Sequence, residues 1–426
     1  MIPRDKKLLV LGSNIGSVEI VQYAKSKGVH TIVADYLPPE KSPAKKVADE
    51  HVLISTADID SLSDLIINKG VNSVFAGISE FNLLRAQELC EKHNLPFYCS
   101  SQQWETIENK ASFRKLCLKC GVPAPITYYS GPACSTNTND VNFPCVVKPV
   151  DASSSQGVSI CKNTEQLSIA IDKAKDSSST GNIIIEDFCE GDEFTAHYVI
   201  ENGVGKLVCV DNRYPIELHK GATTIPIARI YPCSFLNEYI DQVNDSLLEV
   251  CKSIGCEQAV LFIQGIYDVK SNKFAIFEGG LRCAGEAAYR IIDNIFKYNF
   301  LFHLVDYAIS DLTKKSTIND ISPDLMGKKA AIFSFATSGG VLHKIDGLDL
   351  IKKRVPSVIY TECRYPIGSV IPKGDTLRQI VLRFTLVSKD KRQLKNDIRT
   401  INKLLRISDT DGRNICVHFD HESIIL

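Results

Sequence analysis

Residues 144–158 read Pro-Cys-Val-Val-Lys-Pro-Val-Asp-Ala-Ser-Ser-Ser-Gln-Gly-Val, and the rest of the chain is organised around this stretch. Residues 145–147 are apolar and partly β-branched, which predicts the end of a buried strand that Lys148 closes. The small, polar residues 151–157 can turn their backbone N–H groups around phosphate oxygens. The neighbouring lysine adds the point charge that a polyphosphate needs. Taken alone, the pattern also fits a surface hairpin with a solvated lysine.

A second stretch, residues 183–194, reads Ile-Ile-Ile-Glu-Asp-Phe-Cys-Glu-Gly-Asp-Glu-Phe. It predicts an apolar strand, a short hinge, and then Gly191 and Glu193 before another strand. Together the two stretches resemble the ATP-grasp superfamily of carboxylate–amine ligases. The resemblance implies that the residues binding ATP are Lys148, Ser153, Ser154, Ser155 and Gly157 at the phosphates, Glu186, Asp187 and Phe188 at adenine, and Glu193 at the ribose hydroxyls.

Lys110 follows Glu108-Asn109 and matches a further position of this family, an Asn-Lys pair whose lysine reaches the nucleotide phosphates. A solvated helix lysine is the alternative. Nearby, Cys117 and Cys120 are spaced as C-x-x-C. Without a second pair or a neighbouring His this spacing does not predict a zinc site, so we expect the two thiols to pack one helix face.

Residues 258–269 and 273–278 predict two strands that resemble the metal-binding hairpin of the same family. The resemblance implies that Gln264 and Glu278 bind Mg²⁺, with Mn²⁺ as an alternative, and that Arg282 is catalytic. Magnesium prefers hard oxygen ligands and keeps several waters. Gly280 departs from the family pattern, which has Asn there. We expect that restoring Asn at Gly280 would tighten a second metal site, provided that the backbone does not need a positive φ.

The composition excludes several classes of protein. The chain has 426 residues with a formal net charge of −1, which gives no electrostatic case for nucleic acid or an anionic membrane. No signal-peptide pattern and no apolar run of membrane-spanning length occur. The 15 cysteines are scattered and odd in number, which indicates reduced thiols. We therefore expect a cytoplasmic enzyme.

The N-terminal region predicts a parallel α/β sheet with strands at 7–11, 31–35, 73–76 and 95–98. Gly12 and Gly16 form a tight turn after the first strand. The third glycine of a dinucleotide fingerprint is absent, so a separate NAD site is disfavoured. Glu80 follows a strand end, where open α/β sheets bind ligands. It contacts substrate or, alternatively, complements the dipole of the helix at 80–93.

Residues 211–226 are polar and predict a loop. The resemblance places Lys220 near the transferred phosphate and makes it a second catalytic residue beside Arg282. Arg213 and His219 are candidates for substrate or phosphate contact, with ordinary surface polarity as the alternative. Glu286, Tyr289 and Arg290 are expected near the pocket.

We expect three domains. They are an N-terminal parallel-sheet domain preceding the ATP-grasp domain (1–100), an α+β ATP-grasp nucleotide-binding domain (101–326), and a C-terminal α+β domain like that of biotin carboxylase (327–426). The last domain is expected to close one side of the active site and to support a homodimer. The overall fold class is α/β.

The resemblance implies an ATP-dependent, ADP-forming ligase that makes a C–N bond through an acyl phosphate. Its partners would be a small carboxylate and a small amine, and an amino acid is expected to be one of them. Two alternatives stay open. One is another ATP-grasp chemistry, either carboxylation or purine-precursor ligation. The other is an ATP-binding module with impaired catalysis, which Gly280 favours.

Overall fold

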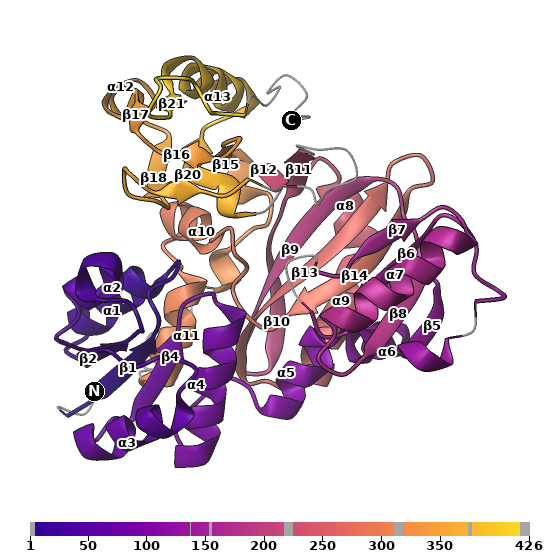
Figure 1. Cartoon of the computed structure of the whole chain (residues 1–426), viewed down its shortest axis with the longest axis horizontal. Helices are drawn as coiled ribbons and strands as arrows, with labels where there is room; N and C mark the ends of the chain where they lie inside the picture. Colours follow the sequence, from indigo (N-terminus) through magenta and orange to yellow (C-terminus); the bar gives the residue numbers. More distant parts are fainter. Residues whose placement is uncertain are drawn as a thin grey trace.

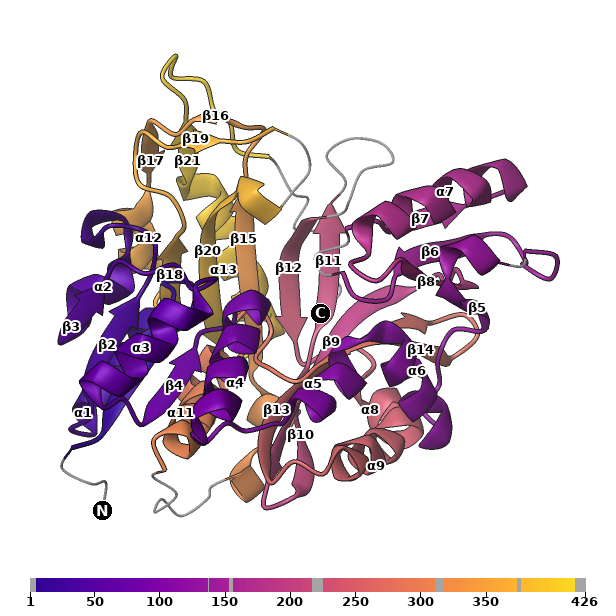
Figure 2. The same cartoon turned by 60° about the horizontal axis from the view of Figure 1, so that its bottom comes forward.

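The structure is a computed structural model that describes residues 5–136, 138–152, 156–216, 225–310, 318–373 and 377–417. Four sheets of four or five strands dominate it, with two small two-stranded ribbons. In Figures 1 and 2 the N-terminal and C-terminal sheets lie on one side of the long strands β9 and β13. The sheet that contains β6–β8 lies on the other side.

The first sheet is parallel, with the strand order β3-β2-β1-β4. Its central strand β1 is buried because Leu8 to Leu11 are apolar without alternation, which is typical of a strand covered on both faces. Gly16 begins the first helix at φ 87°, a conformation that favours glycine. The strands are β1 (Lys7–Leu11), β2 (His30–Ala34), β3 (Glu50–Val52) and β4 (Ser73–Ala76); the helices are α1 (Ser17–Ser26), α2 (Pro43–Val47), α3 (Ile59–Lys69) and α4 (Glu80–His93).

The strand predicted at 95–98 is absent, and this part of the chain is irregular. Pro96 lacks a backbone N–H and so cannot donate to a ladder. Tyr98 is buried and donates its hydroxyl to the Leu281 carbonyl oxygen at 2.9 Å. The segment therefore fastens the first sheet to the loop that follows β14.

Two helices, α5 (Ser101–Glu108) and α6 (Lys110–Lys119), lead into the centre of the chain. They are separate because Asn109 leaves the helical conformation, and its side-chain oxygen accepts from the N–H groups of Ala111 and Ser112. This is an N-cap that starts α6 at Lys110. The cap fixes the backbone from which the Lys110 side chain projects.

Two antiparallel sheets follow. One has the order β5-β8-β6-β7 with α7 (Thr164–Ser177) packed on it, and the other has the order β10-β9-β13-β14 with α9 (Asp245–Ile254) packed on it. The strands of the first are β5 (Thr127–Pro132), β6 (Cys145–Pro149), β7 (Ser159–Cys161) and β8 (Asn182–Asp187); those of the second are β9 (Asp192–Glu201), β10 (Val204–Val210), β13 (Gln258–Asp268) and β14 (Lys273–Gly280). A short α8 (Leu236–Tyr239) and a π-helical turn (Ile240–Asn244) precede α9.

The C-terminal sheet has the order β11-β12-β15-β20-β18. The loop prediction for residues 211–226 is wrong where the structure describes them, because they contain β11 and the start of β12. Ile225, Ile227 and Ile230 of β12 are buried in the core under this sheet. Strands β11 and β12, which precede the predicted domain boundary at 327, thus belong to the same sheet as the strands that follow it. Its strands are β11 (Asn212–Ile216), β12 (Ile225–Tyr231), β15 (Lys329–Ala336), β18 (Val358–Cys363) and β20 (Ile380–Ser388).

The remaining elements cover these sheets. Helices α10 (Tyr289–Phe296) and α11 (Phe300–Ala308) connect the central strands to the first sheet, and one continuous apolar core includes residues of all three. Helices α12 (Leu348–Arg354) and α13 (Lys391–Leu404) pack at the C-terminal end. The ribbons pair β16 (Gly340–Val341) with β19 (Val370–Ile371), and β17 (Lys344–Asp346) with β21 (Arg406–Ser408).

All 15 cysteines lie in the described residues, and all of them are free thiols. Cys117 is buried and Cys120 is half-buried on α6, in agreement with a packing role. Among the helices that the structure describes, none is long and apolar enough to cross a membrane.

Candidate active site

A buried ionic cluster lies where β6 and β8 run side by side. Glu186 of β8 accepts hydrogen bonds from two cations. The Lys148 ammonium donates to one carboxylate oxygen, and Arg114 Nη2 donates to the other at 2.7 Å. Arg114 Nη1 also donates to the Ile276 carbonyl of β14 at 2.6 Å. All three side chains are buried. The Glu186 carboxylate is therefore fully engaged by the protein, which leaves only the backbone of this residue for a ligand.

Burial has opposite effects on the pKa values of these charges. It lowers the pKa of Lys148 because it disfavours the ammonium form, and the attraction of Glu186 only partly opposes this shift. For Glu186 burial acts to raise the pKa, but Lys148 and Arg114 outweigh it and the net pKa is lowered. Burial is therefore the larger effect on the pKa of Lys148, whereas the attraction of the two cations is the larger effect on the pKa of Glu186.

Lys110 approaches the same place from α6. Its ammonium donates to the Ala152 carbonyl oxygen at 2.7 Å, and its charge contributes to lowering the pKa of Lys148. The two predicted phosphate lysines therefore lie near each other. Of the predicted phosphate loop, Ser153, Ser154 and Ser155 lie outside the described residues, as does Lys220.

Gly157, which ends that loop, has φ +72°, and a Cβ on it would lie 2.6 Å from the Ser177 Cβ on α7. No side chain fits there. Gly157 consequently permits the loop to return close to α7, and its backbone is the only part of it that could meet a ligand.

The predicted adenine hinge follows β8. Asp187 accepts a short hydrogen bond from the Tyr128 hydroxyl, and its N–H donates to the Ile126 carbonyl oxygen at 2.9 Å. The Phe188 N–H donates to the Pro144 carbonyl oxygen at 3.3 Å. The N–H of Cys189, next in the chain, has no partner among the described residues. A free backbone donor at this position suits a ring nitrogen of adenine.

Glu193 of β9 pairs with Arg213 of β11, with 2.9 Å between Glu193 Oε2 and Arg213 Nη1. Both side chains keep some contact with solvent. The sequence predicted a ribose contact for Glu193 and a substrate or phosphate contact for Arg213. The structure joins the two, so a ribose bound to Glu193 would share that carboxylate with Arg213.

The predicted metal hairpin is present, and Gln264 and Glu278 are direct cross-strand partners on β13 and β14. Both are half-buried. The Lys148 ammonium lies 5.4 Å from the ring centroid of Phe277, the residue before Glu278. This contact shows that Lys148, which the sequence predicted to bind phosphate, lies next to the hairpin that carries Gln264 and Glu278.

The oxygens of Glu278 and Gln264 fit a hard divalent cation that completes its shell with water and phosphate oxygens. Among the described residues no group of three His, Cys, Asp or Glu side chains could hold a metal. The described residues therefore provide one carboxylate and one amide as ligands here. Such a small ligand set suits a cation that also binds the oxygens of a polyphosphate.

The expectation that Asn at Gly280 would tighten a second metal site meets a steric obstacle, because the Phe262 ring would have to move. Gly280 has no positive φ, but a Cβ on it would lie 2.1 Å from Cε1 of Phe262. Phe262 is the cross-strand partner of Gly280, and its ring centroid lies 4.9 Å from the Arg282 guanidinium carbon. The aromatic ring occupies the space in which an Asn side chain would begin.

Arg282 lies between two carboxylates from different parts of the chain. Its Nη2 donates to Glu80 Oε2 at 3.1 Å, and its Nε lies 3.5 Å from Glu108 Oε1. Glu108 also accepts from the Leu281 N–H at 3.0 Å. The structure thus pairs Glu80, in the first turn of α4, with Arg282; a substrate contact of Glu80 stays a prediction, and its place in the first helical turn also fits the helix-dipole alternative.

Burial raises the pKa of Glu108 to about 7, against the attraction of Arg282 and with help from the charges of Glu80 and Glu278. At neutral pH this carboxyl therefore carries only part of its negative charge. Sequence reasoning missed Glu108, although it directly precedes the Asn109-Lys110 pair.

A second buried network lies behind this site. His197 Nε2 is 2.9 Å from Glu286 Oε1, and Arg229 donates to Asp211 at 2.8 Å and to Thr195 at 2.7 Å. Arg229 Nη2 also lies 3.7 Å from Glu286 Oε2. Burial acts to raise the pKa of Glu286, but Arg229 and His197 outweigh it and lower the pKa. The sequence predicted a place near the pocket for Glu286 and missed the others.

Tyr289 and Arg290, also predicted near the pocket, connect α10 to Glu19 of α1. The Tyr289 hydroxyl donates to Glu19 Oε2 at 2.7 Å, and Arg290 donates to both Glu19 oxygens at 2.7 and 3.0 Å. The loop between β14 and α10 is consequently held near one end by Tyr98, which follows α4, and at the other end by Glu19 of α1.

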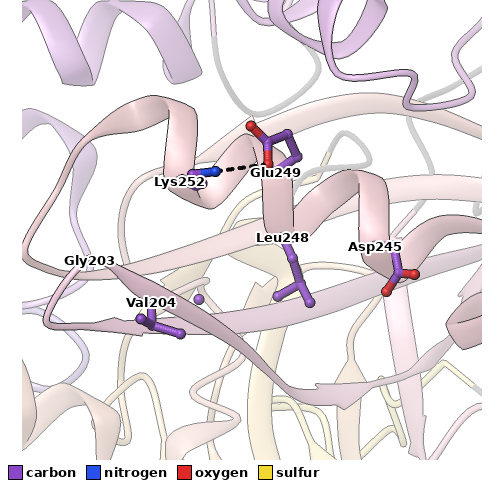
Figure 3. Close-up of a pocket in the computed structure, with 7 residues that line it drawn as sticks. Gly203, Val204, Asp245, Leu248, Glu249 and Lys252 are labelled. Atoms are coloured by element: carbon purple, nitrogen blue, oxygen red, sulfur yellow. Dashed lines mark ion pairs between the residues drawn. The ribbon is translucent and has the colours of Figure 1, made fainter.

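A shallow hollow of about 300 Å³ lies elsewhere, between the β9–β10 turn and α9 (Figure 3). On its α9 side Glu249 and Lys252 form an ion pair of 3.7 Å. None of the predicted site residues lines it, so it is not the predicted active site. Its lining residues are Gly203, Val204, Gly205, Asp245, Leu248, Glu249 and Lys252.

Comparisons with known proteins agree with this geometry. Residues 141–288 match the ATP-grasp domain family, which confirms the resemblance seen in the sequence. A formate-dependent phosphoribosylglycinamide formyltransferase from Bacteroides thetaiotaomicron is 30% identical over 213 residues, which is 48% of this chain and 53% of that protein. The chain spans about half the length of the curated relatives it matches.

Solved structures share the fold over nearly the whole chain. An L-amino acid ligase from Bacillus licheniformis superposes with a TM-score of 0.77 at 18% identity, covering 96% of this chain and 100% of that one. A biotin carboxylase from Campylobacter jejuni gives 0.75 at 14% identity, covering 95% and 92%. The predicted fold class, with its biotin-carboxylase-like C-terminal part, is confirmed.

Proposed function

We propose that this chain, which contains an ATP-grasp domain, is an ATP-dependent ligase that joins a carboxylate to an amine and releases ADP and phosphate. The observation that carries the proposal is the contact of the Lys148 ammonium with Phe277, beside Glu278. Lys148, which we propose as a phosphate-binding lysine, therefore lies against a strand whose oxygens suit a divalent cation. That combination serves phosphoryl transfer, which needs alignment and charge neutralisation more than covalent chemistry from the protein.

The nucleotide would lie between the β6–β8 sheet and β14. Lys110 and Lys148 would meet its phosphates, with the backbone of residues 153–157 folding over them. The free N–H of Cys189 would bind adenine, and Glu193 would accept from the ribose hydroxyls beside Arg213. Glu278 and Gln264 would hold Mg²⁺, or Mn²⁺ in its place, which supplies positive charge to the phosphate oxygens.

In the reaction the substrate carboxylate attacks the γ-phosphorus of ATP, ADP leaves, and an acyl phosphate forms. The amine then attacks the acyl carbon, loses a proton, and expels phosphate. Lys220 would act at the transferred phosphoryl group. Arg282 would stabilise the negative tetrahedral intermediate. Because Glu108 is only partly ionised near pH 7, Arg282 keeps part of its charge available for that task.

An amino acid is our proposal for one of the two substrates. The relatives named above include an amino acid ligase and an enzyme whose name describes formylation of an amine with formate, and both names fit carboxylate–amine chemistry. A cytoplasmic location is proposed because all 15 cysteines are free thiols. A homodimer formed through the C-terminal sheet is proposed as well, and light scattering would test it.

One observation favours a second candidate, an ATP-binding module with impaired catalysis. The Phe262 ring occupies the space beside Gly280, so a further side-chain oxygen cannot be provided there. Such a module would bind MgATP and would release no ADP with any substrate.

The test combines binding with trapping of the acyl phosphate. Calorimetry measures MgATP binding, and ADP release is then followed with a panel of carboxylates, bicarbonate included, in the presence of amines or hydroxylamine. The proposal predicts ATP-dependent hydroxamate from at least one carboxylate. ADP release with bicarbonate alone would indicate a carboxylase, MgATP binding without ADP release would indicate the impaired module, and absence of MgATP binding would refute all three.

A further inference from the structure

The charge of the chain is unevenly distributed along its sequence. Residues 327–426 contain 18 Lys and Arg against 10 Asp and Glu, which is a formal charge of +8. Residues 1–326 contain 31 Lys and Arg against 40 Asp and Glu, which is a formal charge of −9. The net charge of −1, which gave no electrostatic case for an anionic partner, therefore describes neither region.

Basic residues gather where α12 and α13 pack together at the top of Figure 1. A Cβ on Gly347, before α12, would lie 2.2 Å from the Leu404 carbonyl oxygen at the end of α13. At the other end, the hydroxyls of Ser357, after α12, and Ser388, before α13, both donate to Asp397 Oδ2, at 2.7 and 3.1 Å. The two helices are therefore antiparallel, and the last turn of α12 lies near the first turn of α13.

Five exposed cations lie at this junction, and no ion pair joins any of them to a carboxylate of the described residues. They are Lys352, Lys353 and Arg354 of α12, Lys389 before α13, and Arg392 in the first turn of α13. Two carboxylates at the junction are engaged by the protein. Asp390 accepts from the Gln393 N–H at 2.8 Å, and Asp397 accepts from the two serine hydroxyls. These five cations, called the basic junction below, are thus left for a partner outside the described chain.

The stability of the helices explains only part of the basic junction. The three cations of α12 lie in its last turn, where the helix dipole favours them. Lys389 and Arg392 lie at the start of α13, where the dipole disfavours cations. Burial lowers the pKa of Lys329, the strand partner of Ser388, and the charge of Lys391 lowers it further. Like charges therefore repel one another here, and an approaching anionic surface would relieve that repulsion.

The chemistry of the basic junction favours a lipid surface as the partner. Protein interfaces are built on aromatic or apolar anchors and are depleted in lysine, whereas three of these five cations are lysines. Single-stranded nucleic acids stack on aromatic rings, but the ring of Tyr360 on the next strand is already covered by Arg290, 3.6 Å from its centroid. A helix N-terminus can hold a single phosphate, but the Asp390 carboxylate caps α13. Anionic headgroups need only positive charge at a surface, and Leu350 of α12, 46% exposed, adds an apolar side chain.

We propose that the basic junction docks this chain on the surface of an anionic lipid bilayer. The acidic region of residues 1–326 is repelled by the same surface, so the bound molecule is oriented with its α12–α13 end toward the lipid. The contact is peripheral, since none of the described helices could cross a membrane. The proposal does not rest on the ligase function.

The first experiment measures binding of the full chain to vesicles by co-sedimentation. Vesicles of phosphatidylcholine alone are compared with vesicles that also contain phosphatidylserine, at low and at high salt. Wild type should bind only the anionic vesicles, and salt should release it because the cations are exposed. Equal binding to both kinds of vesicle, or no binding to either at low salt, would overturn the proposal.

The second experiment removes charge from the basic junction. Lys352→Gln/Lys353→Gln should lower the partition onto anionic vesicles by about 25-fold, at about fivefold for each removed charge. Lys115→Gln/Lys119→Gln, which removes two exposed lysines of α6, is the matched control and should bind as wild type does. Both variants should unfold at the wild-type temperature, because all four side chains are exposed. An equal loss of binding in both variants would show that net charge alone matters and would overturn the assignment to this junction.

The third experiment separates lipid from other polyanions. Duplex DNA or polyglutamate competes with the anionic vesicles for wild type, and light scattering follows the chain without vesicles. The proposal predicts that vesicles keep the chain when either competitor is present at equal charge. Release from the vesicles by a competitor that no longer binds Lys352→Gln/Lys353→Gln would assign the junction to a nucleic acid or an acidic protein. Salt-sensitive self-association that this variant abolishes would assign it to the acidic region of a second copy, and either result would overturn the lipid assignment.

Discussion

Removing Glu186 should destabilise the chain more than removing Lys148, because the two changes leave different charges buried. Glu186→Gln leaves Lys148 and Arg114 together without a carboxylate, and breaking a buried pair in this way costs about 3–5 kcal/mol. Lys148→Met leaves Glu186 with Arg114 at 2.7 Å, so the loss is about 1.5–3 kcal/mol, that of one hydrogen bond to a charged group. Some of the larger cost is relieved when Lys148 releases its proton, since burial already lowers its pKa.

The measurement is a double-mutant cycle by urea unfolding on wild type, both single variants and Lys148→Met/Glu186→Gln. The double variant should lose clearly less free energy of unfolding than the sum of the two single variants, because Glu186→Gln then no longer leaves a buried Lys148 without its carboxylate. Glu249→Gln, an exposed carboxylate on α9, is the control and should change stability little. A Lys148→Met protein at least as unstable as Glu186→Gln, or strict additivity, would refute the reasoning.

Three further changes test other parts of the site. The pKa of Glu108 in the folded chain is raised to about 7 from 4.5, so the folded state binds a proton there more tightly than the unfolded state. The stability that this proton contributes is fully present below pH 4.5 and is lost as the pH rises through 7. In EDTA, wild type should therefore lose stability between pH 5 and 7 relative to Glu108→Gln, by up to about 1.4 kcal/mol per pH unit; parallel pH curves would contradict this. Gly280→Asn should lower the free energy of unfolding by about 1–3 kcal/mol, because the new side chain overpacks against Phe262. In a denaturation experiment, adding Phe262→Ala should recover much of this loss. A Gly280→Asn protein with wild-type stability would show that the ring moves aside. Glu193→Ala should weaken ATP binding more than binding of a triphosphate analogue without ribose, and equal losses by calorimetry would remove the ribose assignment.

Local patterns were enough for much of the fold. The strands at 7–11 and 73–76 and the helix at 80–93 were predicted at the residues the structure assigns, because uninterrupted apolar runs and helical periodicity are local signals. The hairpin that carries Gln264 and Glu278 was expected from the resemblance to the ATP-grasp family, and the two residues are cross-strand partners in it. The segment at 95–98 failed because Pro96 and the bond from Tyr98 to Leu281 override its apolar character.

The missing site residues depended on contacts between distant parts of the chain. Glu108 becomes notable only when Arg282 and Leu281 are brought against it. Arg229 lies in a segment whose polar start suggested a loop, and its partner Asp211 is visible only once β11 and β12 pair.

Glu278→Gln tests the central claim most directly. This variant keeps the shape of the side chain and removes the charge proposed to hold Mg²⁺ at β14. ADP release with an active carboxylate and amine pair is measured against Mg²⁺ concentration for wild type and variant, with thermal unfolding alongside. The account predicts that turnover collapses at every Mg²⁺ concentration while the unfolding temperature barely changes, since the side chain is only half-buried. Near wild-type turnover of Glu278→Gln at saturating Mg²⁺ would contradict the metal site and the mechanism built on it.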